Sequence, residues 1–265
     1  MNIFEKPNDI QQSSEMFSQV VTACQELLHT PIGADAKQYI QGRLSNYSID
    51  KYRIGYFPNN KNLSLLTQKV DRNILAQLQL IYPVMRRGRG MYYHEDNSIF
   101  NNNNLIIPFY NEYGNIIALA GRTLLSHQER KDLSVSKYKN SVYTKSLHLF
   151  GLDKAQQAIT QNNCAIIVEG QLDCISCHAN GIFNVVAMTG GGLSVYQMYL
   201  LKKMTNRIYL LLDNDEAGQK AKNKIIQNYS KDIEIFIIEL PPTFKDVDNY
   251  LRESNYLNIF DSIQI

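Results

Sequence analysis

The hydrophobic positions of the first eighty residues indicate mainly helical structure. From Ser14 to Leu28, apolar residues recur at intervals of three and four, which predicts an amphipathic helix. A shorter helix is predicted at residues 34–43, a strand at residues 51–58 and a longer helix at residues 62–80. Residues 1–12 are polar and show no period, so we expect no regular element there.

The next stretch changes from irregular to alternating. Residues 86–104, RRGRGMYYHEDNSIFNNNN, follow no period and are predicted to form a loop. Two apolar runs then flank Asn111–Gly114, which predicts a β-hairpin over residues 105–124. Residues 126–141 are again polar.

The second half of the chain alternates apolar runs with segments of helical length. The runs are CAIIV at 164–168, NVVAM at 184–188, IYLLL at 208–212 and IEIFII at 233–238. Continuous apolar runs of this length are typical of parallel strands that are buried on both faces. The chain is therefore predicted to be α/β: an α+β subdomain at residues 1–160 and a doubly wound parallel-sheet domain at residues 161–265.

Composition narrows the class of protein. Hydrophobic residues make up 44% of the 265 residues and charged residues 20%, as in globular proteins. The formal charge of +2 neither requires nor excludes nucleic acid. No apolar run is long enough to span a membrane, and the N-terminus does not resemble a secretory signal. Four cysteines in a chain of this length favour a reducing cytoplasm over a disulfide framework.

Acidic residues follow three of the predicted strands. Glu169 ends the first run, and Asp173 follows four residues later. Asp213 and Asp215 follow the third run, and their spacing of two places both side chains on one side of an extended segment. A third pair of acids follows the last run, at Asp246 and Asp248. The carboxyl ends of parallel strands meet at one edge of a sheet, so we expect these acids to lie together.

A cluster of carboxylates needs a counter-ion, because like charges repel and raise one another's pKa values. Oxygen ligands alone favour a hard divalent cation, Mg²⁺ or Mn²⁺. Each acid also has a simpler interpretation, since an aspartate after a strand is often only a helix cap. Three acidic strand ends at one edge favour the metal site.

The acidic segments resemble the Toprim domain, which bacterial-type primases, topoisomerases and several nucleases share. The matching segments are IIVEGQLDCISCHANGIFNVVAMTGGG, LLLDNDEAGQKA and LPPTFKDVDNYL. Gly218 matches the glycine that follows the paired aspartates. Asn214 departs from the family, because primases usually carry glycine between these two aspartates.

The N-terminal half resembles the RNA-polymerase core of bacterial replicative, DnaG-type primases. The resemblance rests on the arginine-rich loop, Pro108, Gly121-Arg122, the KYKNS segment at 137–141 and Phe150-Gly151-Leu152. It covers about residues 20–255. Asn104 stands where the family commonly has a basic residue, and Ser136 where it has proline.

The resemblance implies a primase that joins ribonucleotides on a single-stranded DNA template. It implies that Asp213 and Asp215 are the principal metal ligands, with Asp173 and either Asp246 or Asp248 assisting. Glu169 is either a ligand or the base that deprotonates the attacking hydroxyl, so Glu169, Asp173, Asp213 and Asp215 are the candidate catalytic residues. Metal ions would bind the triphosphate and stabilise the attacking and leaving oxygens.

Basic residues are the candidate contacts for the template and for NTPs. A basic loop is often no more than a solvated surface, but the glycines of RRGRG allow close approach of the backbone to phosphate. The candidates are Arg86, Arg87, Arg89, Arg122, Lys137 and Lys145.

Two alternatives remain open: a Toprim nuclease that depends on metal, and a non-catalytic nucleic-acid-binding component of the replisome. No Cys/His pairs that would form a zinc ribbon precede residue 86, and the helicase-binding domain of full-length primases is not expected. We therefore expect a replicative helicase, or a separate protein with a zinc module, as partner. Cys174 and Cys177 form a C-x-x-C on a predicted helix, where packing is the favoured interpretation over zinc or redox chemistry. The expected location is the bacterial cytoplasm, with a virus or a plasmid considered as the coding element.

Overall fold

The computed structural model describes residues 7–88 and 91–254. The chain forms two compact units. Unit 1 comprises residues 1–109 and 115–143, and unit 2 comprises residues 110–114 and 144–265. The units meet in the chain at Tyr143–Thr144, so the helix at Leu152–Asn162, which the sequence-based division at residue 160 splits, belongs whole to unit 2.

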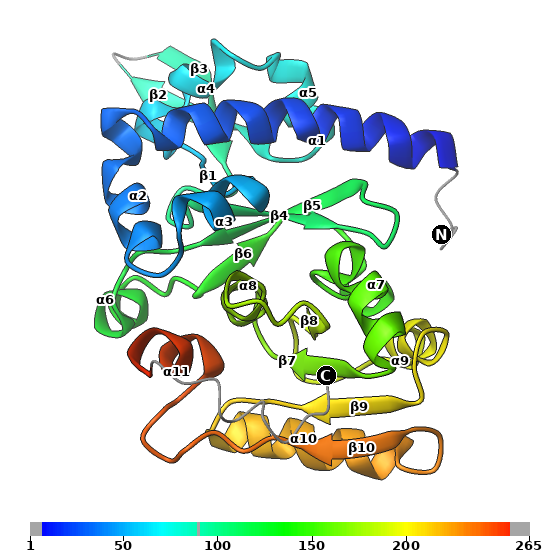
Figure 1. Cartoon of the computed structure of the whole chain (residues 1–265). Helices are drawn as coiled ribbons and strands as arrows, with labels where there is room; N and C mark the ends of the chain where they lie inside the picture. The colour runs from blue at the N-terminus through cyan, green and yellow to red at the C-terminus, as the bar shows by residue number, and fades with distance from the viewer. Residues whose placement is uncertain (1–6, 89–90, 255–265) are drawn as a thin grey trace. The chain divides into compact units, whose positions relative to one another are not determined.

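Unit 1 is built on a four-stranded sheet in the order β1-β4-β5-β6 (Figure 1). The predicted hairpin is present as β4 (Leu105–Tyr110) and β5 (Ile116–Arg122), with a tight turn in which Gly114 has φ +82°. Helix α1 (Pro7–Leu28) packs on β1 (Gly55–Tyr56) and β5. Its buried face includes Val20, Val21 and Cys24, in agreement with the predicted apolar period. The strand β6 spans Tyr138–Asn140.

Helix α1 begins earlier than predicted, because residues 7–12 are helical rather than irregular. Residues 8–12 contain one apolar side chain, Ile10, and Asp9, Gln11 and Gln12 are exposed, so no apolar period marks these turns. Pro7 is the first residue of the helix, where a backbone N–H would have no partner within the helix. Asp9 in the first turn interacts favourably with the positive end of the helix dipole.

Other elements of unit 1 also differ from the predictions. The predicted helix at residues 62–80 is two short helices, and the predicted strand at residues 51–58 is only two residues long. Two further short helices, α3 (Asn46–Lys51) and α6 (His127–Asp132), were not predicted, because they carry too few residues for a readable period. The predicted helix at residues 34–43 is present as α2 (Ala34–Gln41). The two helices that replace the predicted helix at residues 62–80 are α4 (Ser64–Thr67) and α5 (Arg72–Gln77).

The loop predicted at residues 86–104 is wrong for most of its length. Strand β2 (Ile81–Gly88) pairs with β3 (Met91–Ser98) as an antiparallel ribbon, in which Ile81 lies opposite Ser98. Tyr82 and Met85 are exposed and point to opposite faces of β2, so the described side chains of this strand bury no continuous face. Without a buried face a strand needs no alternation of apolar and polar residues, so the pattern was not visible in the sequence.

Unit 2 is a doubly wound α/β domain, as predicted. Its four parallel strands have the order β10-β9-β7-β8. They coincide with the four apolar runs: β7 (Ala165–Val168), β8 (Val185–Ala187), β9 (Arg207–Leu210) and β10 (Glu234–Ile237). The chain proceeds from β7 to β8 on one side and then crosses to β9 on the other side. The topological switch point therefore lies between β7 and β9.

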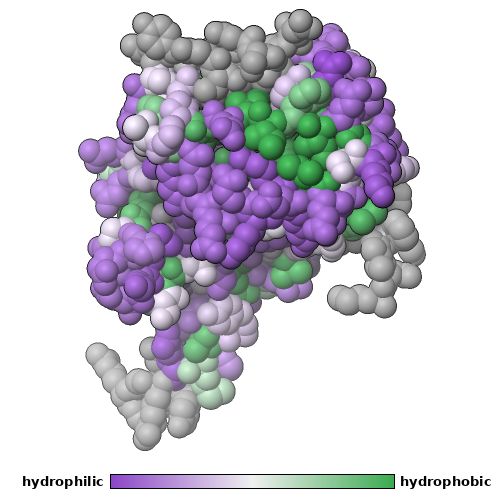
Figure 2. Space-filling model, turned by 90° about the horizontal axis from the view of Figure 1, so that it is seen from below, coloured by the Kyte–Doolittle hydropathy of each residue, from purple (hydrophilic) through white to green (hydrophobic). Residues whose placement is uncertain are grey.

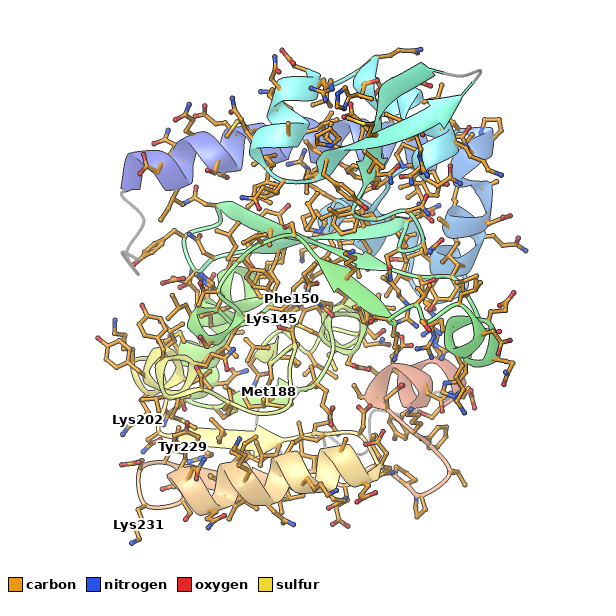
Figure 3. All side chains as sticks on the ribbon, turned by 180° about the vertical axis from the view of Figure 1, so that it is seen from behind. Lys145, Phe150, Met188, Lys202, Tyr229 and Lys231 are labelled. Carbon is orange, nitrogen blue, oxygen red and sulfur yellow. The ribbon has the colours of Figure 1, made fainter. Side chains whose placement is uncertain are left out.

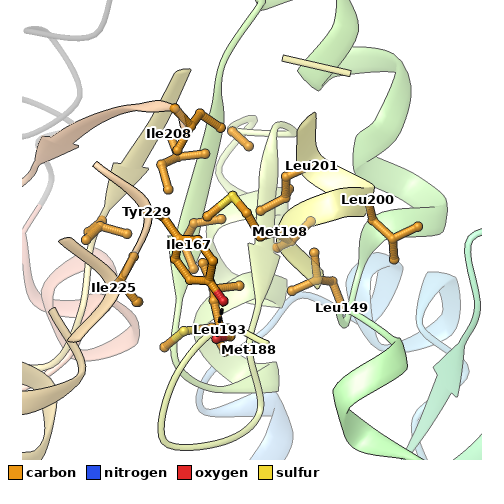
Figure 4. Close-up of a cluster of buried hydrophobic side chains, with 14 of the residues drawn as sticks. Leu149, Ile167, Met188, Leu193, Met198, Leu200, Leu201, Ile208, Ile225 and Tyr229 are labelled. Atoms are coloured by element: carbon orange, nitrogen blue, oxygen red, sulfur yellow. Dashed lines mark hydrogen bonds between the residues drawn. The ribbon is translucent and has the colours of Figure 1, made fainter. Parts of the chain in front are cut away.

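Alternate residues of the strands face two different helical layers. Ala165 and Ile167 join a cluster with buried side chains of three helices, which Figure 4 shows in close-up. In this cluster the hydroxyl of Tyr229 donates to the carbonyl oxygen of Leu193 at 3.2 Å. The three helices are α7 (Leu152–Asn162), α9 (Val195–Lys202) and α10 (Glu216–Tyr229). Helices α8 (Gln171–Ala179) and α11 (Val247–Glu253) pack on each other, and α8 also packs on β8.

The periphery of unit 2 is mostly hydrophilic. Lys202 and Lys231 project outward from it (Figure 3). Strand β10 is the edge of the sheet and leaves Phe236 and Ile237 nearly half exposed. Figure 2 shows hydrophobic side chains gathered within a hydrophilic face on the side where β10 and α10 lie. No helix among residues 7–88 and 91–254 is long and apolar enough to cross a membrane.

Candidate active site

The acidic site lies at the switch point of unit 2, where β7 and β9 end side by side. Glu169 directly follows β7, and Asp213 follows the apolar run of β9. The backbone N–H of Asp213 donates to Oε1 of Glu169 at 3.1 Å, which joins the two strand ends. Both side chains are partly exposed. The predicted convergence of these two acids is therefore present.

Asp173 lies in the first turn of α8 and faces the same edge. Its Oδ2 accepts the Gly170 N–H at 3.1 Å, and its Oδ1 accepts the Asp248 N–H at 3.4 Å. Burial raises the pKa of Asp173 well above its usual range, and repulsion from Asp246, Asp213 and Asp248 raises it further. The elements thus bring Asp173 within electrostatic range of acids from two other segments.

Asp215 is the N-cap of α10. Its carboxylate accepts the Gly218 N–H at 3.0 Å, and its Oδ2 lies 3.8 Å from Nζ of Lys245. Gly218 is required here by close approach, because a Cβ atom would overlap the carbonyl oxygen of Asp213 and would come within 2.9 Å of Oε1 of Glu169. The glycine therefore lets α10 start directly against the acidic strand end.

The last acidic pair splits into two environments. Asp246 is partly exposed and caps α11, where it accepts the Asn249 N–H at 2.8 Å. Asp248 is 3% exposed. It accepts the Ser176 hydroxyl at 2.5 Å and the Arg252 Nε at 3.3 Å, so its charge is compensated inside the protein. Asp246 is therefore the more available of the two for a ligand.

The donor chemistry of the cluster fits a hard divalent cation, since every acid offers only oxygen. Burial first, and repulsion from the neighbouring acids second, raise the pKa of Asp173, and a cation at this edge would offset that repulsion. Among the residues that the structure describes, no three His, Cys, Asp or Glu side chains converge closely enough to hold one ion. A single ion at this edge would need the carboxylates to lie closer together than they do in this structure. Asp213 and Asp215 are both partly exposed to solvent.

The predicted basic residues have different surroundings. Arg122 is held between Tyr39 and Tyr138, and donates to each hydroxyl at 2.8 Å. Arg86 is exposed on β2 and pairs with Glu95 at 3.1 Å. The Arg87 side chain and the whole of Arg89 lie outside the described part of the chain. Lys137 and Lys145 are exposed. Lys137 lies just before β6 in unit 1, and Lys145 lies in unit 2, in the segment that precedes α7 (Figure 3).

The C-x-x-C cysteines behave as packing residues. Cys174 and Cys177 are both buried on α8 and carry free thiols. Burial raises the pKa values of both thiols, so neither is prepared to act as a thiolate. The favoured interpretation from the sequence, packing against the sheet, agrees with this environment.

Two family models match the chain, one in its N-terminal half and one in its C-terminal half. The model for the N-terminal domain of the DNA primase catalytic core matches residues 23–156, half of the chain. A Toprim-like model matches residues 166–251, which contain the whole acidic site. The chain belongs to the DNA primase catalytic core family. The resemblance inferred from the sequence is confirmed.

Curated relatives and solved structures agree with the family. The DNA primase of Synechococcus elongatus is 32% identical over 86% of this chain, and that of Aquifex aeolicus is 30% identical over 83%. The chain spans 33% and 42% of the length of these two relatives. A crystal structure of the zinc-binding and RNA polymerase domains of the Aquifex aeolicus primase matches 99% of this chain and 63% of its own, with 25% identity and a TM-score of 0.76. The RNA polymerase domain of Mycobacterium tuberculosis primase, at 20% identity and a TM-score of 0.76, shares the fold.

Several residues near the site were not predicted from the sequence. Ser176 and Arg252 hold Asp248, and Lys245 faces Asp215. Ser176 follows Asp173 on α8 and Arg252 follows Asp248 by four residues, a spacing that places Arg252 on the same helix face. The Ser176–Asp248 contact joins segments 72 residues apart and has no local signal.

Proposed function

We propose that this chain is the RNA-polymerising core of a primase, which joins ribonucleoside triphosphates on single-stranded DNA. The observation that supports this most directly is the set of carboxylates at the β7/β9 switch point in a chain whose first half matches the primase core model. A structure described as a DnaG catalytic domain bound to ssDNA shares this fold, with 24% identity and a TM-score of 0.75. The proposed setting is cytoplasmic DNA replication.

The proposed ligands for Mg²⁺ or Mn²⁺ are Asp213, Asp215 and Asp246, with Glu169 at the same edge. When bound, divalent ions neutralise triphosphate charge and stabilise the attacking and leaving oxygens of phosphoryl transfer. Asp173 has a raised pKa, and it accepts backbone hydrogen bonds that hold its carboxyl group behind this edge. We assign Asp173 to orientation of the acidic segments, and Asp248 to the fixing of α11 against α8 through Ser176.

Glu169 has two possible roles at the site. Its Oε1 accepts the Asp213 N–H, so this oxygen orients the end of β9. The Glu169 carboxylate either binds an ion or accepts the proton of the attacking 3′-hydroxyl. A Glu169→Gln variant separates the roles: loss of a ligand lowers metal affinity, whereas loss of the base lowers the rate at saturating metal.

The partners of the reaction are part of the proposal. Lys137 and Lys145, both exposed, are the proposed contacts for template or triphosphate, with Arg86 and the arginines that follow it. Arg122 is proposed to shape this surface through Tyr39 and Tyr138. We also propose that efficient priming requires a replicative helicase or a protein with a zinc module.

The test is a priming assay with the purified chain, single-stranded DNA, NTPs and Mg²⁺ or Mn²⁺. Short RNA whose length and sequence depend on the template is the expected product. Degradation of the DNA in the presence of metal alone would identify a nuclease instead. Metal and DNA binding with neither product, even when primase partners are added, would favour a non-catalytic replisome component.

A further inference from the structure

Asn214 lies between the two acids that follow β9 and makes contacts that its neighbours do not. Its side-chain Nδ2 donates to the carbonyl oxygens of Leu240 at 3.1 Å, Pro241 at 3.2 Å and Phe244 at 3.0 Å. Its backbone N–H donates to the carbonyl oxygen of Lys245 at 2.9 Å. One residue therefore binds four carbonyl groups of the segment that joins β10 to α11.

The chemistry of the contact requires an amide. A side-chain NH₂ group has two protons, and three surrounding carbonyls can share them only if the nitrogen, not the oxygen, faces the loop. Glycine, which primases usually carry at this position, offers no side-chain donor. An aspartate of the same shape would bring a charged acceptor against three acceptors.

The segment that Asn214 holds carries two charged groups of the acidic site. Lys245 places its Nζ 3.8 Å from Oδ2 of Asp215. Asp246 caps α11 and contributes to the raised pKa of Asp173. The Pro241–Lys245 loop contains one internal turn bond, from the Phe244 N–H to the Pro241 carbonyl. The loop is attached to the end of β9 by three hydrogen bonds from Asn214, to Pro241, Phe244 and Lys245, and by the Lys245–Asp215 ion pair.

We propose that Asn214 is a positioning residue that ties the Pro241–Lys245 loop to the end of β9 and thereby sets Asp246 and Lys245 beside Asp213 and Asp215. It acts through the loop and does not touch the reacting atoms. Its effect on priming rests on the proposed function. Its effect on the loop and on metal affinity does not.

The test compares Asn214→Ala, Asn214→Gly and Asn214→Asp with a control, Asn228→Ala. The control removes an exposed asparagine near the C-terminal end of α10. Hydrogen exchange is followed at the backbone amides of Asn214 and Phe244. The amide of Leu211, which donates to Ile167 within the sheet, is the internal reference. Mn²⁺ affinity is measured by calorimetry without nucleotide.

We expect exchange at Asn214 and Phe244 to accelerate at least about fivefold in the alanine and glycine variants, the factor that corresponds to roughly one lost hydrogen bond. Exchange at these amides should be faster still in the aspartate variant, while the exchange rate of the Leu211 amide stays unchanged in all variants. Mn²⁺ affinity should fall severalfold in the alanine and glycine variants. In the priming assay, the metal concentration for half-maximal rate should rise more than the KM for NTP.

Two results would overturn the proposal. The first is exchange in Asn214→Asp equal to that of the wild type, which would show that shape and not the donor matters. The second is unchanged Mn²⁺ affinity in all three variants although the loop exchanges faster, which would show that the loop does not set the acids. If the wild type makes no RNA, both readouts still decide, and only the proposed function fails.

Discussion

At the scale of single residues, acids with the same sequence pattern have different tasks. Asp246 and Asp248 stand two residues apart, yet Asp246 is partly exposed and Asp248 is buried against Ser176 and Arg252. The difference follows from the helix that they begin: the N-cap of α11 faces the sheet edge, whereas its second residue faces α8. Environment, and not spacing, separates a candidate ligand from a structural carboxylate.

Replacing Asp213 or Asp215 with asparagine should abolish RNA synthesis, because each change removes one charged ligand. The fold should persist, since asparagine is itself a good N-cap in place of Asp215. Without metal, the melting temperature should hold or rise, because acid–acid repulsion is relieved. Thermal unfolding in EDTA and the priming assay measure both effects. Wild-type rates of synthesis in both variants would contradict the metal assignment.

Asp173 should make the metal-free protein less stable as pH rises. Its folded-state pKa is raised, so the folded protein keeps a proton that the unfolded chain releases near pH 4. The contribution to the free energy of unfolding is thus full below that pH and is lost as pH rises through the folded-state pKa. Urea unfolding in EDTA across this range should show a steeper decline for the wild type than for Asp173→Asn. Parallel curves would show that Asp173 does not carry the effect.

At the scale of elements, the start of α10 depends on contact between a helix and a strand end. Gly218 lies where any side chain meets the carbonyl group of Asp213. The backbone N–H of Gly218 also donates to the carboxylate of Asp215, the N-cap of α10. The first turn of α10 therefore packs directly against both candidate metal ligands, Asp213 and Asp215.

Gly218→Ala should lower the free energy of unfolding by about 1–3 kcal/mol, because a Cβ atom has to displace backbone and not a flexible side chain. Ala221→Gly on the same helix is a matched change in the opposite direction, which costs only helix propensity and a small buried methyl group. Denaturant unfolding measures both. In Gly218→Ala, metal affinity should also fall, since Asp213 and Asp215 shift apart. Retained stability with wild-type metal affinity would mean that the strand end yields without cost.

At the scale of the whole molecule, the proposed charges are divided between the two units. Every described acid of the site belongs to unit 2, and Arg86, Arg122 and Lys137 belong to unit 1. With a formal charge of only +2, attraction for nucleic acid has to come from local basic groups and not from the overall charge. Unit 2 thus holds the acids together with the proposed contact Lys145, and unit 1 holds the other described basic candidates.

Lys137→Ala should weaken binding of single-stranded DNA without changing metal affinity. If Lys137 contacts phosphate, the slope of log affinity against log salt should become shallower by about 1. Fluorescence anisotropy at several salt concentrations measures this slope. The control is Lys231→Ala, an exposed lysine of unit 2 outside the proposed surface (Figure 3). Equal slopes for wild type and both variants would remove Lys137 from the proposed template contacts.

The sequence alone determined the parallel domain and the place of its acids. Four continuous apolar runs correspond to β7, β8, β9 and β10, because strands buried on both faces leave a local signature. Position after a strand end then places Glu169 and Asp213 at one edge, since all parallel strands end on the same side. The long helix and the central hairpin of unit 1 were likewise readable from local periods.

Only the tertiary structure decided what depends on contacts between distant segments. Among the described side chains of the β2–β3 ribbon, Tyr82 and Met85 are exposed on opposite faces of β2, so no buried face imposes an alternation on this strand. The hydrogen bond between Ser176 and buried Asp248 joins residues that lie 72 positions apart in the sequence. The hydrogen bond from Asn214 to Phe244 of the Pro241–Lys245 loop joins residues 30 positions apart. Sequence periodicity reports how one element meets its surroundings. It does not report which partner a polar side chain finds across the fold, and in this chain that choice separates the proposed metal ligands from the residues that position them.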